Sequence, residues 1–179
     1  MTKQLNYNKD IMDWKEFPKY DMIWCDPPWE QRMVKYFETV MRRDSGREAS
    51  NTITNIINKL GTLSSTDKLT VIEYGIKGHE LVIELMENLG HKFISKHERT
   101  YDKRPFLVLV FNVAIEMYDT KNESELITKT LLSLKNIKTV FDPFAGIGFT
   151  AKAVRKAGIE YIGSEINPAR FEKLKKINT

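Results

Sequence analysis

Cysteine, histidine and long apolar runs are all scarce in this sequence of 179 residues. Its only cysteine, Cys25, excludes an internal disulfide framework and a zinc site built from cysteines, so a reducing compartment fits the chain. No apolar run approaches the length that spans a bilayer, and the first residues lack the apolar core of a signal peptide. The three histidines show no metal-ligand spacing with acids or cysteines. We therefore expect a cytoplasmic protein without a bound metal.

The composition is otherwise ordinary. Hydrophobic residues make up 41% and charged residues 29% of the chain, which is typical of a soluble globular protein. The length suits one domain with a substantial core. A formal charge of +4 permits an anionic partner such as a nucleic acid but does not require one.

Apolar periodicity divides the chain into alternating strands and helices. This alternation predicts a mainly parallel α/β sheet. We expect strands over 5–10, 22–25, 69–74, 139–141 and 161–163, and a hairpin formed by a strand from Phe93 and one over 106–113. Helices are expected over 30–42, 53–61, 78–90, 126–134 and 149–156, with a last helix from Pro168, a helical turn over 13–18 and a polar loop over 42–48.

The stretch Asp26-Pro27-Pro28-Trp29 follows directly on the first buried strand. The two prolines lack backbone donors and have fixed φ angles, so they hold Asp26 and Trp29 rigidly at a strand's carboxyl end, where open α/β sheets bind ligands. Asp26 and the Pro27 carbonyl could accept both hydrogens of an exocyclic amine while Trp29 stacks on the ring that carries it. The alternative is an Asp-capped turn beside a core tryptophan.

A second motif lies near the end of the chain. Residues 142–150, DPFAGIGFT, follow a strand and open a helix, and Gly146 and Gly148 allow a tight turn that approaches a ligand closely. Glu165 follows Gly146 by 19 residues, close to the spacing of a carboxylate that binds ribose hydroxyls. The motif predicts a site for a nucleoside-containing cofactor. Because only one helix follows, upstream strands must complete the sheet, an order that would be unusual for an NAD enzyme.

The early DPPW motif and the late stretch FDPFAGIGFTAKAVRKAGIEYIGSEINP together resemble circularly permuted, β-type DNA adenine-N6 methyltransferases that use S-adenosylmethionine. The resemblance implies a Rossmann-like class I methyltransferase fold with a seven-stranded, mainly parallel sheet and one antiparallel strand. It implies a single domain over 1–179, with a catalytic-motif half over 1–114 and a cofactor-binding half over 120–179. The methyl acceptor would be the N6 amine of adenine in DNA.

Site residues follow from the resemblance by position. The glycine loop would contact the methionine end of the cofactor. Glu165 would bind the ribose, with Asn167 nearby, and Asp10 would contact the adenine. The catalytic set is then Asp26, Pro27, Pro28 and Trp29, and the cofactor-binding set is Asp10, Asp26, Asp142, Pro143, Phe144, Ala145, Gly146, Gly148, Thr150, Glu165 and Asn167.

The chain departs from this family in one respect. Between 113 and 139 there is no room for a target-recognition insert, so we expect no separate target-recognition domain. Two basic stretches could contact DNA phosphates instead, although each could equally be an ordinary solvated face. Their arginines and lysine are Arg32, Arg42, Arg43, Arg47, Lys103 and Arg104.

Several alternatives stay open. The substrate could be duplex DNA with a flipped base or single-stranded DNA, and a homodimer or a partner subunit could supply target recognition. RNA adenosine methyltransferases share the DPPW motif, so RNA is a second acceptor to test. A non-catalytic, cofactor-binding partner subunit of a methyltransferase complex is the alternative from another functional class. Host protection and phage anti-restriction are equally compatible with the motifs.

Overall fold

The computed structural model describes residues 3–45, 52–101 and 103–178. Their strands form one seven-stranded sheet in the order β1-β7-β6-β2-β3-β5-β4, in which β5 alone runs antiparallel to its neighbours. The predicted fold class is confirmed. The strands are β1 (Gln4–Tyr7), β2 (Met22–Cys25), β3 (Leu69–Gly75), β4 (Phe93–Tyr101), β5 (Arg104–Phe111), β6 (Thr139–Asp142) and β7 (Glu160–Ser164).

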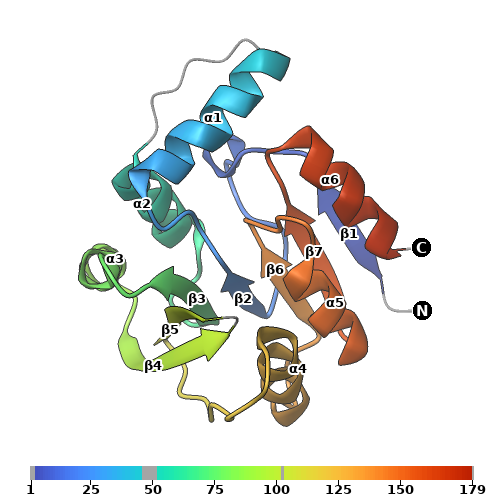
Figure 1. The fold of residues 1–179 in the computed structure, drawn as a ribbon. Helices are drawn as coiled ribbons and strands as arrows, with labels where there is room; N and C mark the ends of the chain where they lie inside the picture. The colour runs from blue at the N-terminus through green and yellow to red at the C-terminus, as the bar shows by residue number, and fades with distance from the viewer. Residues whose placement is uncertain (1–2, 46–51, 102, 179) are drawn as a thin grey trace.

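Helices cover both faces of the sheet (Figure 1). Alternate residues of the buried strands point to opposite faces, so Ile23 and Ile72 belong to one apolar cluster while Trp24 and Val71 belong to the other. The first cluster includes residues of α1, α2 and α3, and the second includes residues of α4, α5 and α6. The helices are α1 (Gln31–Ser45), α2 (Ile53–Leu63), α3 (His79–Asn88), α4 (Glu123–Ser133), α5 (Phe149–Lys156) and α6 (Pro168–Lys175).

The pairing of β2 with β6 brings the two sequence motifs together. These strands are parallel neighbours, with Met22 opposite Val140 and Ile23 opposite Phe141. Each motif begins at the carboxyl end of its own strand, so the two lie side by side although they are far apart in the sequence. The edge where they meet is the edge at which open α/β sheets bind ligands.

Three local predictions were wrong. Helix α1 continues to Ser45, so Arg42 and Arg43 lie in a helix rather than in a loop. Helix α2 does not stop at Gly61; a β-carbon there would lie 2.7 Å from Leu89 Cδ1, so this glycine allows α2 to pack closely against the end of α3. The expected turn over 13–18 is instead a 3₁₀ turn over Ile11–Asp13.

That turn lies earlier because the aromatic residues that follow it are needed in the core. The rings of Trp14 and Phe17 pack edge-on against Phe141, with centroid distances of 5.8 and 4.8 Å. The Asp10 side chain caps the turn by accepting from the Met12 backbone N–H at 3.0 Å. Sequence periodicity could not separate these core rings from the apolar face of a short helix.

None of the helices in the described part of the chain is both long and apolar enough to cross a membrane.

Candidate active site

A cavity of about 470 Å³ opens at the carboxyl ends of β2, β6 and β7. Its volume is within the range of cavities that hold small molecules and cofactors. Both sequence motifs contribute to its wall. The predicted site residues that line it are Asp10, Asp26, Pro27, Pro28, Trp29, Arg32, Arg104, Pro143, Phe144, Gly146 and Glu165.

The corner formed by the first motif is fixed by several contacts at once. The Trp29 indole N–H donates to Asp26 Oδ1 at 2.6 Å, and the Tyr74 hydroxyl donates to the Trp29 carbonyl at 3.1 Å. The indole stacks on Phe106 at a centroid distance of 6.3 Å. A β-carbon on Gly75 would lie 3.2 Å from Trp29 Cε3, so this glycine leaves room for the ring. The motif therefore presents Asp26 with one oxygen engaged and the other available.

The Asp26 carboxyl group is in an unusual electrostatic position. It is exposed to solvent in the cavity, yet surrounding protein atoms displace most of its hydration, and this desolvation raises its pKa to about 7. The hydrogen bond from Trp29 lowers the pKa, the charges of Glu123 and Asp142 raise it, and the charge of Arg170 lowers it. Asp26 can therefore change its protonation state near neutral pH.

Asp142 holds the start of the glycine loop in place through hydrogen bonds. It is 1% exposed, its Oδ1 accepts from the Phe144 backbone N–H at 3.0 Å, and its Oδ2 accepts from the Tyr161 hydroxyl at 3.3 Å. Burial raises the pKa of Asp142 to about 7 against the effect of these hydrogen bonds and one from Thr150. The role of Asp142 in the structure is to hold the loop rather than to line the cavity.

Glu165 connects the end of β7 to the glycine loop. Its Oε1 accepts from the Asn167 backbone N–H at 2.6 Å, and the Gly146 backbone N–H donates to the same carboxyl group. Asn167 in turn caps α6, with Oδ1 accepting from the Arg170 backbone N–H at 3.1 Å. Burial raises the pKa of Glu165. These contacts place a carboxylate on the cavity wall in a fixed orientation.

Four further predicted cofactor residues do not line the cavity. Ala145, Thr150 and Asn167 are buried, and their positions suit support of the loop and of the α6 cap. Gly148 has a φ of 88°, and a β-carbon there would lie 2.9 Å from Leu174 Cδ1. The structure gives Gly148 a packing role, because the missing side chain allows the start of α5 to pack against α6, while its predicted approach to a cofactor stays a prediction.

The predicted DNA-contacting residues are only partly brought together. Arg32 and Arg104 line the cavity, and Arg32 also forms an ion pair with Glu30. Lys103 lies at the hairpin tip, next to Arg104 but outside the cavity wall. Arg42 and Arg43 lie on α1, and Arg47 lies outside the described residues.

Sequence reasoning missed two cations that line the cavity, Lys9 and, of more consequence, Arg170. Its guanidinium carbon lies 4.7 Å from the centroid of the Phe37 ring, which joins α6 to α1 across the cavity. Its charge also favours ionisation of both Asp26 and Glu165. A cation two residues after a Pro at the start of a helix gave no usable sequence signal. In the described part of the chain, no three His, Cys, Asp or Glu residues cluster in a way that could hold a metal ion.

Comparisons with known proteins address the fold and the C-terminal part of the chain. Residues 116–176 match the family model described as DNA methylase, while no curated protein matches the chain. The structure of M1.HpyAVI is similar with a TM-score of 0.67 and 18% identity, covering 97% of each chain.

Two further structures extend the comparison. TTHA0409 from Thermus thermophilus, a putative DNA modification methylase complexed with S-adenosyl-L-methionine, gives a TM-score of 0.65 at 14% identity, covering 98% of this chain and 92% of that one. PvuII DNA methyltransferase, which is cytosine-N4-specific, gives 0.56 at 11% identity, covering 99% and 87%. The chain thus has the class I methyltransferase fold of these proteins, and its last third matches the DNA methylase family model.

Proposed function

We propose that this chain transfers a methyl group from S-adenosylmethionine to the exocyclic N6 amine of adenine in DNA. The observation that carries the proposal is the shared cavity, in which the DPPW corner and the glycine loop with its carboxylate face the same space. The DNA methylase match over 116–176 and the methyltransferase fold support it. The complexes of similar structures with S-adenosylmethionine support the choice of cofactor.

The donor set in the cavity fits that cofactor. Glu165 offers carboxylate oxygens for ribose hydroxyls, and Gly146, with a φ of 55°, brings bare backbone to the cavity wall. Phe144 and Asp10 would complete the binding surface toward the methionine and adenine ends. When bound, S-adenosylmethionine supplies a methyl group activated by a sulfonium centre. Both acidic and basic side chains line the cavity, which suits a ligand that carries groups of both charges.

The chemistry assigned to Asp26 follows from the weak nucleophilicity of an aromatic amine. The amine's lone pair is delocalised into the base, so acceptors on its hydrogens are needed to favour tetrahedral geometry and to stabilise the growing positive charge. Asp26 would provide one acceptor and the Pro27 carbonyl the other. Once it carries the methyl group, the amine would have one proton too many, and the Asp26 carboxylate would accept that proton. A pKa of about 7 suits that acceptance at neutral pH.

A base must leave its helix to enter the cavity. We infer that it is flipped out of a duplex or taken from a single strand, and that the cavity side of Trp29 replaces part of its lost stacking. Phe106 stacks on the indole and Gly75 lies against it, so the ring is held in place before a base arrives. Such preorganisation lowers the entropic cost of binding.

The N4 amine of cytosine is a second candidate acceptor. It is an exocyclic amine with the same delocalised lone pair, and the similarity to the cytosine-N4-specific PvuII enzyme favours considering it. The acceptor groups of the DPPW corner would serve either amine.

The deciding experiment is a methylation assay with isotopically labelled S-adenosylmethionine on duplex DNA, single-stranded DNA and RNA, followed by mass analysis of the nucleosides. N6-methyladenine in DNA supports the proposal, whereas N4-methylcytosine in DNA favours the second candidate. Label in RNA alone would assign the protein to RNA. Binding of the cofactor without transfer to any nucleic acid would favour a non-catalytic partner subunit. Adding a second subunit, or varying the protein concentration, tests the prediction that an oligomer supplies target recognition.

A further inference from the structure

A basic hollow lies on the outer surface of α5, outside the cavity. We name it the α5 patch and define it by the cations Lys152, Arg155, Lys156 and Lys176 together with Phe149. The hollow has a volume of about 680 Å³ and no acidic residue in its lining. All four cations are exposed, and so is half of the Phe149 side chain. Nothing in the proposed chemistry uses these residues.

Three of the four cations of the α5 patch are not paired with acidic side chains of the described residues. Among the described residues, no acidic side chain forms an ion pair with Lys152, Arg155 or Lys156. Two acids on the neighbouring helices pair with other lysines: Glu172 pairs with Lys175 at 2.6 Å, and Glu125 pairs with Lys129 at 2.9 Å.

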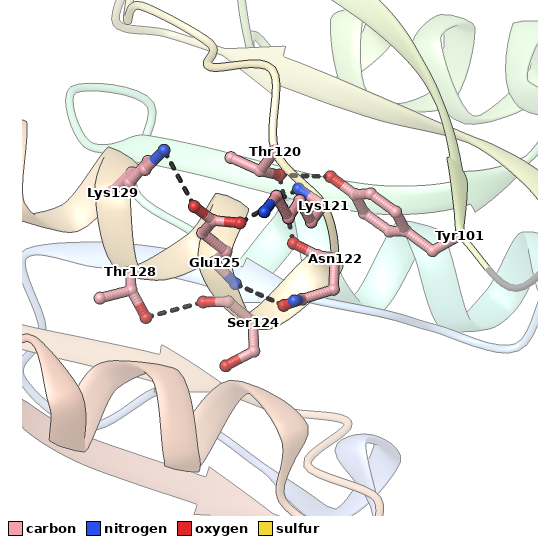
Figure 2. A network of polar contacts seen from close by, with 8 residues as sticks. All are labelled: Tyr101, Thr120, Lys121, Asn122, Ser124, Glu125, Thr128 and Lys129. Atoms are coloured by element: carbon pink, nitrogen blue, oxygen red, sulfur yellow. Dashed lines mark hydrogen bonds and ion pairs between the residues drawn. The ribbon is translucent and has the colours of Figure 1, made fainter.

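Figure 2 shows the partners of Glu125. Its carboxylate lies among Lys121 and Lys129, accepting from the Lys121 backbone N–H at 3.1 Å. Ser124, which lines the hollow, lies apart from this carboxylate at the first turn of α4 (Figure 2). Glu123, the other acid next to Ser124 in sequence, raises the pKa values of Asp26 and Glu73.

One end of the α5 patch is close in sequence to the cavity wall. Gly146 lines the cavity, and Phe149, three residues later, begins α5 at the edge of the hollow. On the other side, Ser124 follows Glu123, whose charge raises the pKa of Asp26. A strand that delivers a base to Asp26 would pass the start of α5, and the cations of the patch follow from there along the helix.

We propose that the α5 patch binds the phosphate backbone of the DNA strand that flanks the target base. The patch has this role only if DNA is the substrate, so the assignment rests on the proposed function. Lysine and arginine contacts to phosphates give affinity and register without reading sequence. A basic surface of this kind would supply part of the DNA affinity that an enzyme without a target-recognition insert otherwise lacks.

The test is the salt dependence of DNA binding by a double variant, Lys152→Gln with Lys156→Gln. Each lost phosphate contact on duplex DNA lowers the slope of log K against log salt by about 0.9, so we expect a decrease of about 1.8 and binding weaker by roughly tenfold or more at moderate salt. The probe is a short fluorescent duplex followed by anisotropy.

The matched control is Lys19→Gln with Lys92→Gln. Both lysines are exposed and lie outside the lining of the cavity and of the α5 patch, and the control loses the same net charge. A salt slope and affinity equal to those of the control would overturn the proposal. The turnover rate at saturating DNA should stay at the wild-type value in both double variants, because neither alters the cavity.

The outcomes separate this proposal from the proposed function. Patch-dependent DNA binding without methylation of any base would reject the enzyme activity while keeping the binding surface. Methylation with affinity that is independent of Lys152 and Lys156 would reject the α5 patch while keeping the activity.

Discussion

Removing the charge of Asp142 should stabilise the protein, and the gain should grow with pH. This carboxyl group is 1% exposed, and burial is the largest cause of its rise in pKa from 3.8 to about 7. The folded state therefore holds a proton that the unfolded chain releases between these two values. Since the folded state binds more protons in that window, the stability of the fold falls as pH rises through it.

The magnitude follows from the two pKa values. The difference between 3.8 and about 7, at about 1.36 kcal/mol for each unit, corresponds to a cost of about 4 kcal/mol once the pH exceeds both. At about pH 5.5 only about 2 kcal/mol of this cost has appeared. Asn at position 142 cannot ionise, keeps an oxygen for the Phe144 N–H, and lets the Tyr161 hydroxyl accept from its amide. We expect Asp142→Asn to gain about 2 kcal/mol more stability at about pH 8 than at about pH 5.5.

Urea unfolding followed by tryptophan fluorescence at the two pH values measures this change directly. The difference between variant and wild type at each pH removes the contributions of groups that titrate alike in both proteins. The Asp142 charge raises the pKa of Asp26, so any change in the Asp26 contribution is part of the measured difference. Asp119→Asn, which removes a fully exposed carboxylate, controls for the loss of net charge. An equal stability difference at both pH values, or a larger gain at the lower pH, would refute the reasoning.

Three other predictions concern the site and its support. Asp26→Asn should keep cofactor binding, measured by calorimetry, while the rate of methyl transfer falls by at least about 100-fold. In the wild-type protein, kcat/KM should rise with pH through about 7, because only the ionised Asp26 carboxylate accepts a proton. Gly75→Ala should displace the Trp29 indole, because the new β-carbon would lie 3.2 Å from the ring. Methyl transfer should become slower, and the free energy of unfolding measured in urea should fall by about 1–3 kcal/mol. Trp24→Phe removes the indole N–H that donates to the buried Glu73 carboxyl group at 2.6 Å. Thermal or urea unfolding should show that the free energy of unfolding falls by about 1–3 kcal/mol.

Much of the fold and the site could be predicted because the informative residues are local. The prolines after Cys25 fix the chain at the end of β2, and the glycine loop with the carboxylate of Glu165 has a spacing set by one strand-helix-strand unit. Parallel strands then bring both motifs to one edge of the sheet in whichever order they occur along the chain. The long sequence separation between Asp26 and Gly146 is therefore compatible with a shared cavity.

The parts that sequence could not predict depend on tertiary contacts. Gly61 and Gly148 suggested a helix end and a ligand contact, yet both are explained by helix packing against Leu89 and Leu174. The local sequence does not distinguish these roles, because a glycine required by close packing and a glycine required at a helix end are the same residue. Arg170 was missed for a related reason: its partner Phe37 lies on a helix from the other half of the chain.

The carboxyl groups with raised pKa values lie in and around the cavity, and this arrangement has a functional consequence. Around and beneath the cavity, Asp26, Asp142 and Glu165 have raised pKa values, as do Glu73 and Glu123 below them, mainly because of burial. The cations of the α5 patch lie on the outer surface. A positively charged cofactor and a developing positive charge fit the acidic interior, while a polyanionic strand fits the basic exterior. Salt screens exposed charges far more than enclosed ones, so rising ionic strength should weaken DNA binding well before it affects the cofactor or the methyl-transfer step.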